Sequence, residues 1–414
     1  MIITIRLQKW IDYIAAVTLV SFFAIPTLRA AAGVPQTVYF VAIAVLVGIA
    51  TVNLCLRRAR APTRPMQLFI CLSLLLFGWM LFSSFWAPSV VDYTQDVQLI
   101  LGLTLIVVSV PFVLNERVIR LFVWLLVCAG VGVATFVYHS YSVAGGLIGP
   151  DGETHDFYLT ISQLLGASAV GLTLYSFTAT RWHWWMIAVP YLLGGLALSL
   201  ARGSLLAVLL IILTAGLYKS LRKPVMRFSL ASYIKSNLKR VGGLVAIAGI
   251  VIGVAATAMT VERTAARLLR MFDGGGAPLD TRGAIWSRAW ESIQEAPILG
   301  HGLGSSGLMS GGTYPHNMFL QIWLDAGVFP LVIVCSLLGT PIIALVMHRK
   351  NMISDNKIWI PCIGIYLFMI MEYSKSYDFY TSRVLFISGL IFVSSVFLFP
   401  CSEDGSKKIK LTSQ

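Results

Sequence analysis

The sequence predicts an all-α polytopic membrane protein with about twelve transmembrane helices. Of its 414 residues, 57% are hydrophobic and only 12% are charged, whereas about a quarter of the residues in a soluble globular protein carry charge. Its apolar stretches repeatedly approach the roughly 20 residues that a helix needs to cross the hydrocarbon core of a bilayer. Because these stretches are continuous rather than alternating, they indicate helices and not the strands of a barrel.

The predicted helices follow one another through short connections, with a single long interruption. They lie near residues 10–31, 36–56, 66–86, 97–114, 121–138, 157–179, 184–200, 203–218, 241–261, 328–347, 358–372 and 384–400. The chain therefore divides into residues 1–261 with transmembrane helices 1–9, a large helical loop at 262–327, and residues 328–414 with helices 10–12 and a short cytoplasmic tail. The loop ends in a short interfacial helix at 316–326, because Asp325 is costly at membrane depth and Gly327 and Pro330 tend to break a helix.

The distribution of cations orients the chain. With both termini cytoplasmic, most of the 31 Lys and Arg residues fall on the inner side, as the positive-inside rule requires. The net charge of +13 therefore reflects membrane topology, and we expect membrane lipids but no nucleic acid as partners. The loop 262–327 then lies on the outer side. The cations left on that side are Arg29, Arg202, Arg263, Arg267, Arg270, Arg282, Arg288, Lys375 and Arg383.

Arg202 lies at the outer end of the seventh predicted helix. A charged side chain at the end of a membrane helix costs free energy unless it is paired, so Arg202 needs a partner. Gly203 and Ser204 open the next helix, whose free N–H groups and positive dipole end favour an anion. The alternative is a structural ion pair.

Two pieces of the outer loop carry arginines, on either side of a flexible joint at Gly274, Gly275 and Gly276. On the first piece Arg263, Arg267 and Arg270 recur at i, i+4 and i+7 and form one basic stripe, which can bind phosphate oxygens or ordinary lipid headgroups.

The second piece is an amphipathic helix whose apolar face includes Trp286 and Trp290. Arg282 falls near the centre of this face, so it must either extend to water or meet an anion in a partly dry cleft. Arg288 points elsewhere on the same helix.

His316 is the best placed histidine for chemistry, because it follows Tyr314 and Pro315 at the start of the interfacial helix. A helix N-terminus disfavours the imidazolium, so His316 can act as a neutral general base, although a purely structural cap would have the same position.

The segment His316-Asn317, followed by nine residues and Gly327, resembles the signature of bacterial O-antigen ligases, the WaaL family. The motifs TRGAIW and PILGHGLG are similar to a region that these ligases share with O-antigen polymerases. Pro330, three residues after Gly327, departs from the family pattern. The resemblance implies a GT-C-like glycosyltransferase architecture with one large periplasmic loop, in the bacterial inner membrane.

The same resemblance implies specific roles for the residues selected above. His316, Arg202 and Arg282 would be catalytic. Beside these three, we expect from their positions in the outer loop that substrate is bound by Arg263, Arg267, Arg270, Arg288, Tyr314 and Asn317. The implied reaction moves a glycan from undecaprenyl diphosphate to a sugar hydroxyl of lipid A-core, with inversion, and we expect neither a metal nor another cofactor.

Three other functions remain open from the sequence. An O-antigen polymerase would use the same donor with a lipid-linked repeat as the acceptor, and a protein O-oligosaccharyltransferase is a further relative. A twelve-helix transporter is less favoured, since its halves should look alike and its costly charges should lie near the bilayer midplane. The glycan, the core sugar and the oligomeric state are not determined by the sequence.

Overall fold

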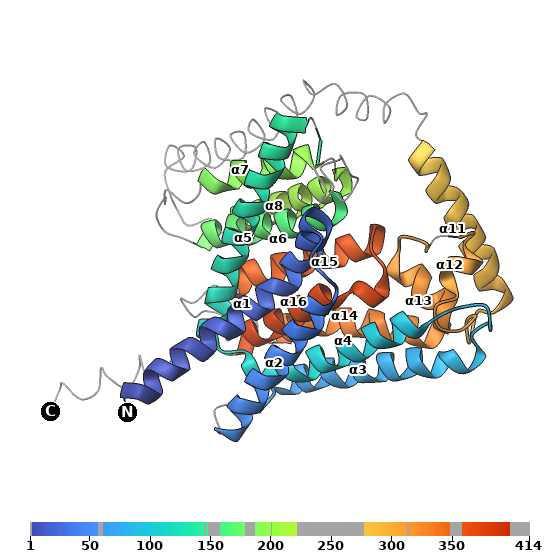
Figure 1. The fold of residues 1–414 in the computed structure, drawn as a ribbon, viewed down its shortest axis with the longest axis horizontal. Helices are drawn as coiled ribbons and strands as arrows, with labels where there is room; N and C mark the ends of the chain where they lie inside the picture. Colours follow the sequence, from blue (N-terminus) through green and yellow to red (C-terminus); the bar gives the residue numbers. More distant parts are fainter. Residues whose placement is uncertain are drawn as a thin grey trace.

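The computed structural model describes residues 2–56, 61–144, 146–147, 158–178, 187–199, 201–221, 277–312, 314–347 and 358–397. Every regular element in these ranges is a helix (Figure 1), which confirms the predicted all-α class. Seven helices are long and apolar enough to cross a membrane, and α7, α8 and α16 add shorter apolar helices. The chain is therefore a polytopic membrane protein. The predicted helix at 241–261 and the joint at 274–276 lie outside the described residues.

The helices before the outer loop match the predicted spans closely. They are α1 (Ile2–Ala32), α2 (Thr37–Cys55), α3 (Arg64–Phe82) with the 3-10 turn η1 (Ser83–Trp86), α4 (Thr94–Val113), α5 (Glu116–Ala144), α6 (Tyr158–Thr178), α7 (Ala188–Leu198) and α8 (Arg202–Leu221). The described part of the loop contains α11 (Ala277–Glu295), α12 (Ser306–Met309) and α13 (Met318–Ala326). The chain then continues through α14 (Val328–Met347), α15 (Trp359–Lys375), η4 (Phe379–Thr381) and α16 (Arg383–Phe397).

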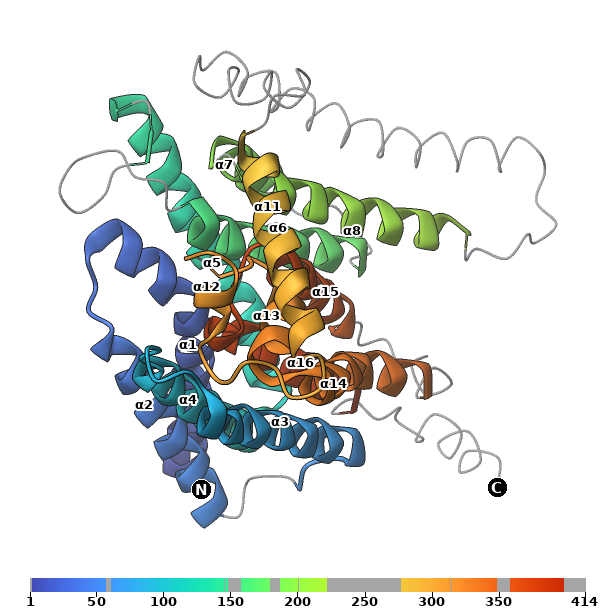
Figure 2. The same ribbon diagram turned by 90° about the vertical axis from the view of Figure 1, so that its right-hand side faces the viewer.

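Helices α6 and α15 pack against each other in the interior of the bundle (Figure 2). Glycine allows this close approach, because the ring of Phe368 fills the space where a side chain at Gly166 would stand. Gly364 likewise leaves room for Leu174 of α6. Without a hydrophobic driving force between helices in lipid, such van der Waals fit is what holds the two helices together.

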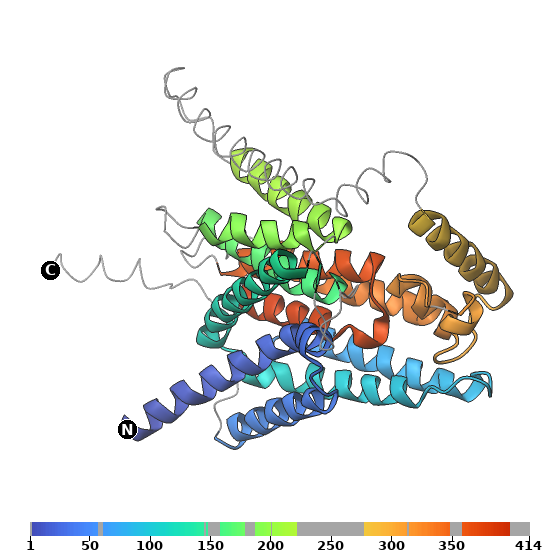
Figure 3. The same ribbon diagram turned by 45° about the horizontal axis from the view of Figure 1, so that its top comes forward.

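One end of the bundle carries the outer-loop helices, and we call it the loop face: α11–α13, η1 and η4 lie there, away from the N-terminal end of α1 (Figures 1 and 3). The indole of Trp79 at the end of α3 donates to the oxygen of Ala326 at 2.9 Å, and that of Trp86 to the oxygen of Leu299 at 3.2 Å. These bonds fix α13, the interfacial helix that the sequence predicts, against the bundle.

Candidate functional site

The turn that follows α15 collects contacts from segments that are remote in the chain. Arg282 Nη1 on α11 donates to the main-chain oxygen of Lys375 at 3.4 Å, and Tyr314 Oη donates to the main-chain oxygen of Ser376 at 3.3 Å. The backbone of Ser376 also forms a hydrogen bond with His316. We call residues 375–376 the Ser376 turn. It brings together three residues that the sequence singled out separately.

His316 has an unusual backbone conformation, with φ at 53°, the single positive φ of a non-glycine residue in the described part of the chain. Such a conformation costs energy and persists only where its surroundings determine it. On one side Trp286 Nε1 donates to the oxygen of Pro315 at 2.8 Å. On the other side Asn317 caps α13, its side-chain oxygen accepting from the backbone N–H groups of Phe319 and Leu320 at 3.0 and 3.2 Å. His316 is thus held between two fixed neighbours.

The surroundings of His316 keep its imidazole neutral. Burial lowers its pKa, and the nearby Arg282 guanidinium lowers the pKa further, although the hydrogen bond with Ser376 acts in the opposite direction. The ring lies against Tyr314, with 4.2 Å between ring centroids. Nδ1 is buried and has no hydrogen-bond partner among the described residues. A neutral imidazole with one bonded nitrogen and one open nitrogen suits a general base.

The first turn of α8, which begins with Arg202, reaches the same place through its neighbours. Ser204 Oγ donates to Glu372 Oε2 at 3.0 Å and accepts from Lys375 Nζ at 3.1 Å. Lys375 Nζ also lies 2.7 Å from Glu372 Oε1, and the Glu372 side chain is fully buried. A methyl group at Gly203 would lie 2.9 Å from Lys375 Nζ, so glycine leaves room for the ammonium group. Arg202 itself is partly buried.

Sequence reasoning missed Glu372 and treated Lys375 only as an outer cation. The available signal was a carboxylate three residues before a lysine at the end of an apolar helix, since groups at i and i+3 share one helix face. A buried carboxylate in such a helix needs a partner, and the structure supplies both Lys375 and Ser204.

The other predicted site residues have different positions. Arg288 is exposed on α11 and its guanidinium lies against Gly311. Asn317 forms the helix cap described above. The predicted stripe of Arg263, Arg267 and Arg270 lies outside the described residues.

A second buried cluster holds the outer loop in place. Asp325 in α13 is fully buried and accepts hydrogen bonds from Tyr380 Oη and the Ser306 backbone N–H, both at 2.6 Å. Ser305 Oγ adds a bond at 3.2 Å. Burial raises the pKa of Asp325 to about 7. The cost that the sequence predicts for this carboxylate is thus offset by three donors.

Chemically, the Ser376 turn combines a neutral base with positive charge. Arg282 is close enough to act electrostatically on both His316 and Lys375. This arrangement suits a transfer in which a hydroxyl loses a proton and an anionic group departs. Among the residues that the structure describes, no group of three or more His, Cys, Asp or Glu side chains could hold a metal ion.

The comparison with protein families gives one match, at residues 187–335, to a family model described as O-antigen ligase. The matched segment begins at the start of α7 and ends within α14. It contains Arg202, Arg282, Tyr314 and His316, whereas Lys375 and Ser376 lie beyond it. No curated protein matches the chain.

Proposed function

We propose that this chain, whose residues 187–335 match a family model described as O-antigen ligase, transfers a glycan from undecaprenyl diphosphate to a sugar hydroxyl of lipid A-core. The coarse function, glycan transfer in lipopolysaccharide assembly, follows from the family. The specific donor and acceptor are our proposal, and so is the location in the inner membrane with the loop face toward the periplasm. The distribution of cations along the sequence supports this orientation.

The observation that carries the proposal is the meeting of His316 and Arg282 at the Ser376 turn. His316 takes the proton of the acceptor hydroxyl as its oxygen forms a bond to the anomeric carbon. The bond from that carbon to the diphosphate breaks at the same time, and the electron pair leaves with the diphosphate. Arg282 and Arg202 stabilise this anion, because guanidinium groups are always charged and donate in a bidentate geometry. One displacement on one carbon inverts its configuration.

Arginine charges at the diphosphate take the place that a divalent cation has in many phosphate-transfer sites. We therefore expect transfer to proceed in chelator, without a metal or a nucleotide. Tyr314 positions His316 through its ring contact and its bond to Ser376. The roles of Arg263, Arg267, Arg270 and Arg288 in binding substrate stay predictions.

The proposal is tested by reconstitution of the purified full-length protein with undecaprenyl-diphosphate-linked O-antigen and lipid A-core, in chelator and without nucleotide. Wild type is compared with His316→Ala and with a matched control, His139→Ala, which removes an exposed imidazole from α5. We expect a ladder of core-linked glycan from wild type and from the control, and a loss of roughly 100-fold or more in the rate for His316→Ala.

Two other results of this assay would contradict the proposed ligase function. Wild type that lengthens a lipid-linked repeat and makes no core-linked ladder is an O-antigen polymerase. A deletion strain separates the same two functions, because loss of the ligase leaves polymer on undecaprenyl diphosphate, whereas loss of the polymerase leaves single repeats on the core. Wild type that makes neither product contradicts both the ligase and the polymerase, and favours the transporter.

A further inference from the structure

Two predicted outer-side arginines that the proposed reaction does not use both lie near Tyr39, at the start of α2. Arg29, in the last turn of α1, donates from Nη1 to Gln36 Oε1 at 3.2 Å. Arg383, the first residue of α16, donates from Nη2 to Tyr39 Oη, with its guanidinium carbon 3.6 Å from the centroid of that ring. Because residues 36 and 39 are one helical turn apart, they share a face of α2. The two guanidinium groups therefore flank one patch, the arginine pair.

The positive charge of the arginine pair is not neutralised locally. Among the described residues, no carboxylate lies within 4.0 Å of either guanidinium group. Asp378 is close enough to interact electrostatically with Arg383, but its Oδ1 accepts from the backbone N–H of Tyr380. Arg383 Nε is buried without a hydrogen-bond partner in the described part of the chain. An anion with several oxygens, bound through outward-facing guanidinium nitrogens, would balance both charges.

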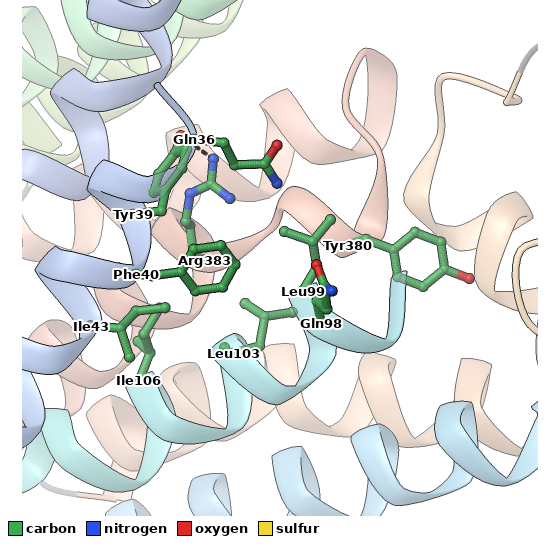
Figure 4. Close-up of a pocket in the computed structure, with 11 residues that line it drawn as sticks. Gln36, Tyr39, Phe40, Ile43, Gln98, Leu99, Leu103, Ile106, Tyr380 and Arg383 are labelled. Carbon is green, nitrogen blue, oxygen red and sulfur yellow. Dashed lines mark hydrogen bonds between the residues drawn. The ribbon is translucent and has the colours of Figure 1, made fainter. Parts of the chain in front are cut away.

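Arg383 lines a shallow groove between α2, α4 and α16 (Figure 4), with about 360 Å³ of empty space over its wall, open solvent included. Gln36 lies beside Arg383 in this groove, and Gln98 and Tyr380 also line it (Figure 4). The rest of the wall is apolar, from Phe40, Ile43, Leu99, Leu103 and Ile106. Gly102 contributes to the wall without a side chain, and this leaves the groove open.

A charged end that continues into an apolar groove within the membrane-spanning helices fits an amphiphile with an anionic head and a hydrocarbon chain. Hydrocarbon would bind along the apolar wall as it does in the bilayer, while phosphate oxygens would meet the guanidinium donors. Neither a soluble phosphate nor a neutral lipid matches both ends.

We propose that this groove binds one acyl chain of the acceptor lipid, with a phosphate of its lipid A headgroup on Arg383 and Arg29. The proposal rests on the proposed function, which requires an acylated and phosphorylated acceptor beside the donor. The donor diphosphate occupies Arg202 and Arg282, so the acceptor must use other cations of the same face. The segment from Ser376 to Arg383 connects the two places: Ser376 contacts His316, and Arg383 lines the groove.

Lipid binding tests the proposal without turnover. Purified full-length protein in detergent is titrated by native mass spectrometry with lipid A, with lipid A lacking its phosphates, and with phosphatidylglycerol. Four variants are compared: Arg383→Gln removes the charge, Arg383→Lys keeps it, Gly102→Leu fills the groove, and Arg120→Gln removes an exposed cation that pairs with Glu116 in α5. The last is the matched control.

We expect the affinity for lipid A to fall roughly 10-fold or more in Arg383→Gln and in Gly102→Leu, to recover in part in Arg383→Lys, and to stay unchanged in Arg120→Gln. Wild type should bind phosphate-free lipid A as weakly as Arg383→Gln binds lipid A. In the transfer assay, the KM for the acceptor should rise in Arg383→Gln while kcat stays within about twofold.

Equal affinity for phosphatidylglycerol, lost in the same variants, would assign the groove to bulk lipid and overturn the proposal. Unchanged lipid A binding in Arg383→Gln would overturn it as well. If both Arg383 variants fail to fold, Gly102→Leu decides, because it leaves the charges in place. If wild type transfers glycan but the variants bind lipid A as wild type does, only the proposed lipid site in the groove is refuted. If lipid A binding depends on Arg383 but wild type transfers no glycan, the proposed ligase function is refuted.

Discussion

Arg282 Nη1 donates to the main-chain oxygen of Lys375 at 3.4 Å, across 93 residues of sequence. This bond joins α11 of the outer loop to the end of α15 at the point where the Ser376 backbone contacts His316. It also fixes a permanent positive charge beside the imidazole. In the proposed reaction Arg282 acts both on the base and on the departing diphosphate, and the two effects are separable by experiment.

Replacing Arg282 by Gln is expected to shift the pH profile of transfer. The Arg282 charge lowers the pKa of His316, so its removal raises that pKa and the imidazole becomes protonated at higher pH. A protonated imidazole cannot act as the base. The acid limb of the initial rate, measured between pH 5 and 8, should therefore move to higher pH in Arg282→Gln.

Arg282→Gln should also lose roughly 100-fold in rate at pH 8, where His316 is neutral in both proteins, because one stabilising donor at the diphosphate is missing. Arg288→Gln is the control on the same helix, since Arg288 is exposed and lies against Gly311. An acid limb that stays in place, or moves to lower pH, would show that Arg282 does not control the imidazole.

Adding a methyl group at Gly203 is expected to disturb Lys375 without unfolding the protein. The new Cβ would lie 2.9 Å from Lys375 Nζ, the flexible end of a long side chain, which can move away at little cost. That movement breaks the 3.1 Å bond to Ser204 and shifts positive charge at the Ser376 turn. Transfer by Gly203→Ala should fall about 10-fold with a melting temperature within a few degrees of wild type.

Another helical glycine supplies the control for Gly203→Ala. A methyl group added at Gly132 in α5 would meet open space, so Gly132→Ala should retain wild-type activity. Wild-type activity in Gly203→Ala would instead show that the position of Lys375 does not matter for transfer.

The long membrane helices could be predicted from the sequence because each is specified locally, by an apolar run of bilayer length. The short helix α13 was predictable from another local signal, since Asp325, Gly327 and Pro330 disfavour a continuous span. His316 was chosen for its position at the start of a helix, and Arg282 for the free-energy cost of a charge on an apolar helix face. Both form a hydrogen bond with the Ser376 turn.

The turn itself could not be predicted, because its contacts are made by backbone oxygens of residues 375 and 376, which leave no mark in the sequence. The same limit applies to the partners of Asp325. Its need for donors is visible in the sequence, but the pairing with Tyr380, 55 residues away, depends on how α13 and η4 pack. Local patterns indicate which groups need partners, and tertiary structure determines which partners they find.

Asp325→Asn is expected to remove a pH dependence of stability. Burial raises the pKa of Asp325 from 3.8 to about 7, so between these values the folded protein retains a proton that the unfolded chain releases. Stability from this group is therefore largest near pH 4 and falls as the pH rises to 7, above which it changes no further. Asparagine does not titrate, and its side-chain oxygen can still accept from the Ser306 N–H.

Melting temperatures of wild type and Asp325→Asn in detergent at pH 5, 6 and 7.5 measure this difference. The value for wild type minus that for the variant should decrease by roughly a few degrees from pH 5 to pH 7.5. Titrating groups that do not interact with Asp325 cancel in the difference, because both proteins contain them; Asp96, which interacts electrostatically with Asp325, is present in both. A difference that is constant or increases with pH would contradict a protonated Asp325 in the folded protein.

Substitutions of Asn317 distinguish a helix cap from a substrate contact. The sequence resemblance predicts that Asn317 binds substrate, whereas in the structure its side-chain oxygen accepts from Phe319 and Leu320. Loss of such a cap costs about 1 kcal/mol and would release the strained backbone of His316 next to it. We expect Asn317→Ala to lower kcat about 10-fold, with a small loss in melting temperature.

Serine caps a helix as well as asparagine but has no amide to offer a sugar. If the cap positions His316, Asn317→Ser should restore most of the rate; a Ser variant as slow as the Ala variant, with normal stability, would instead place the amide on the substrate.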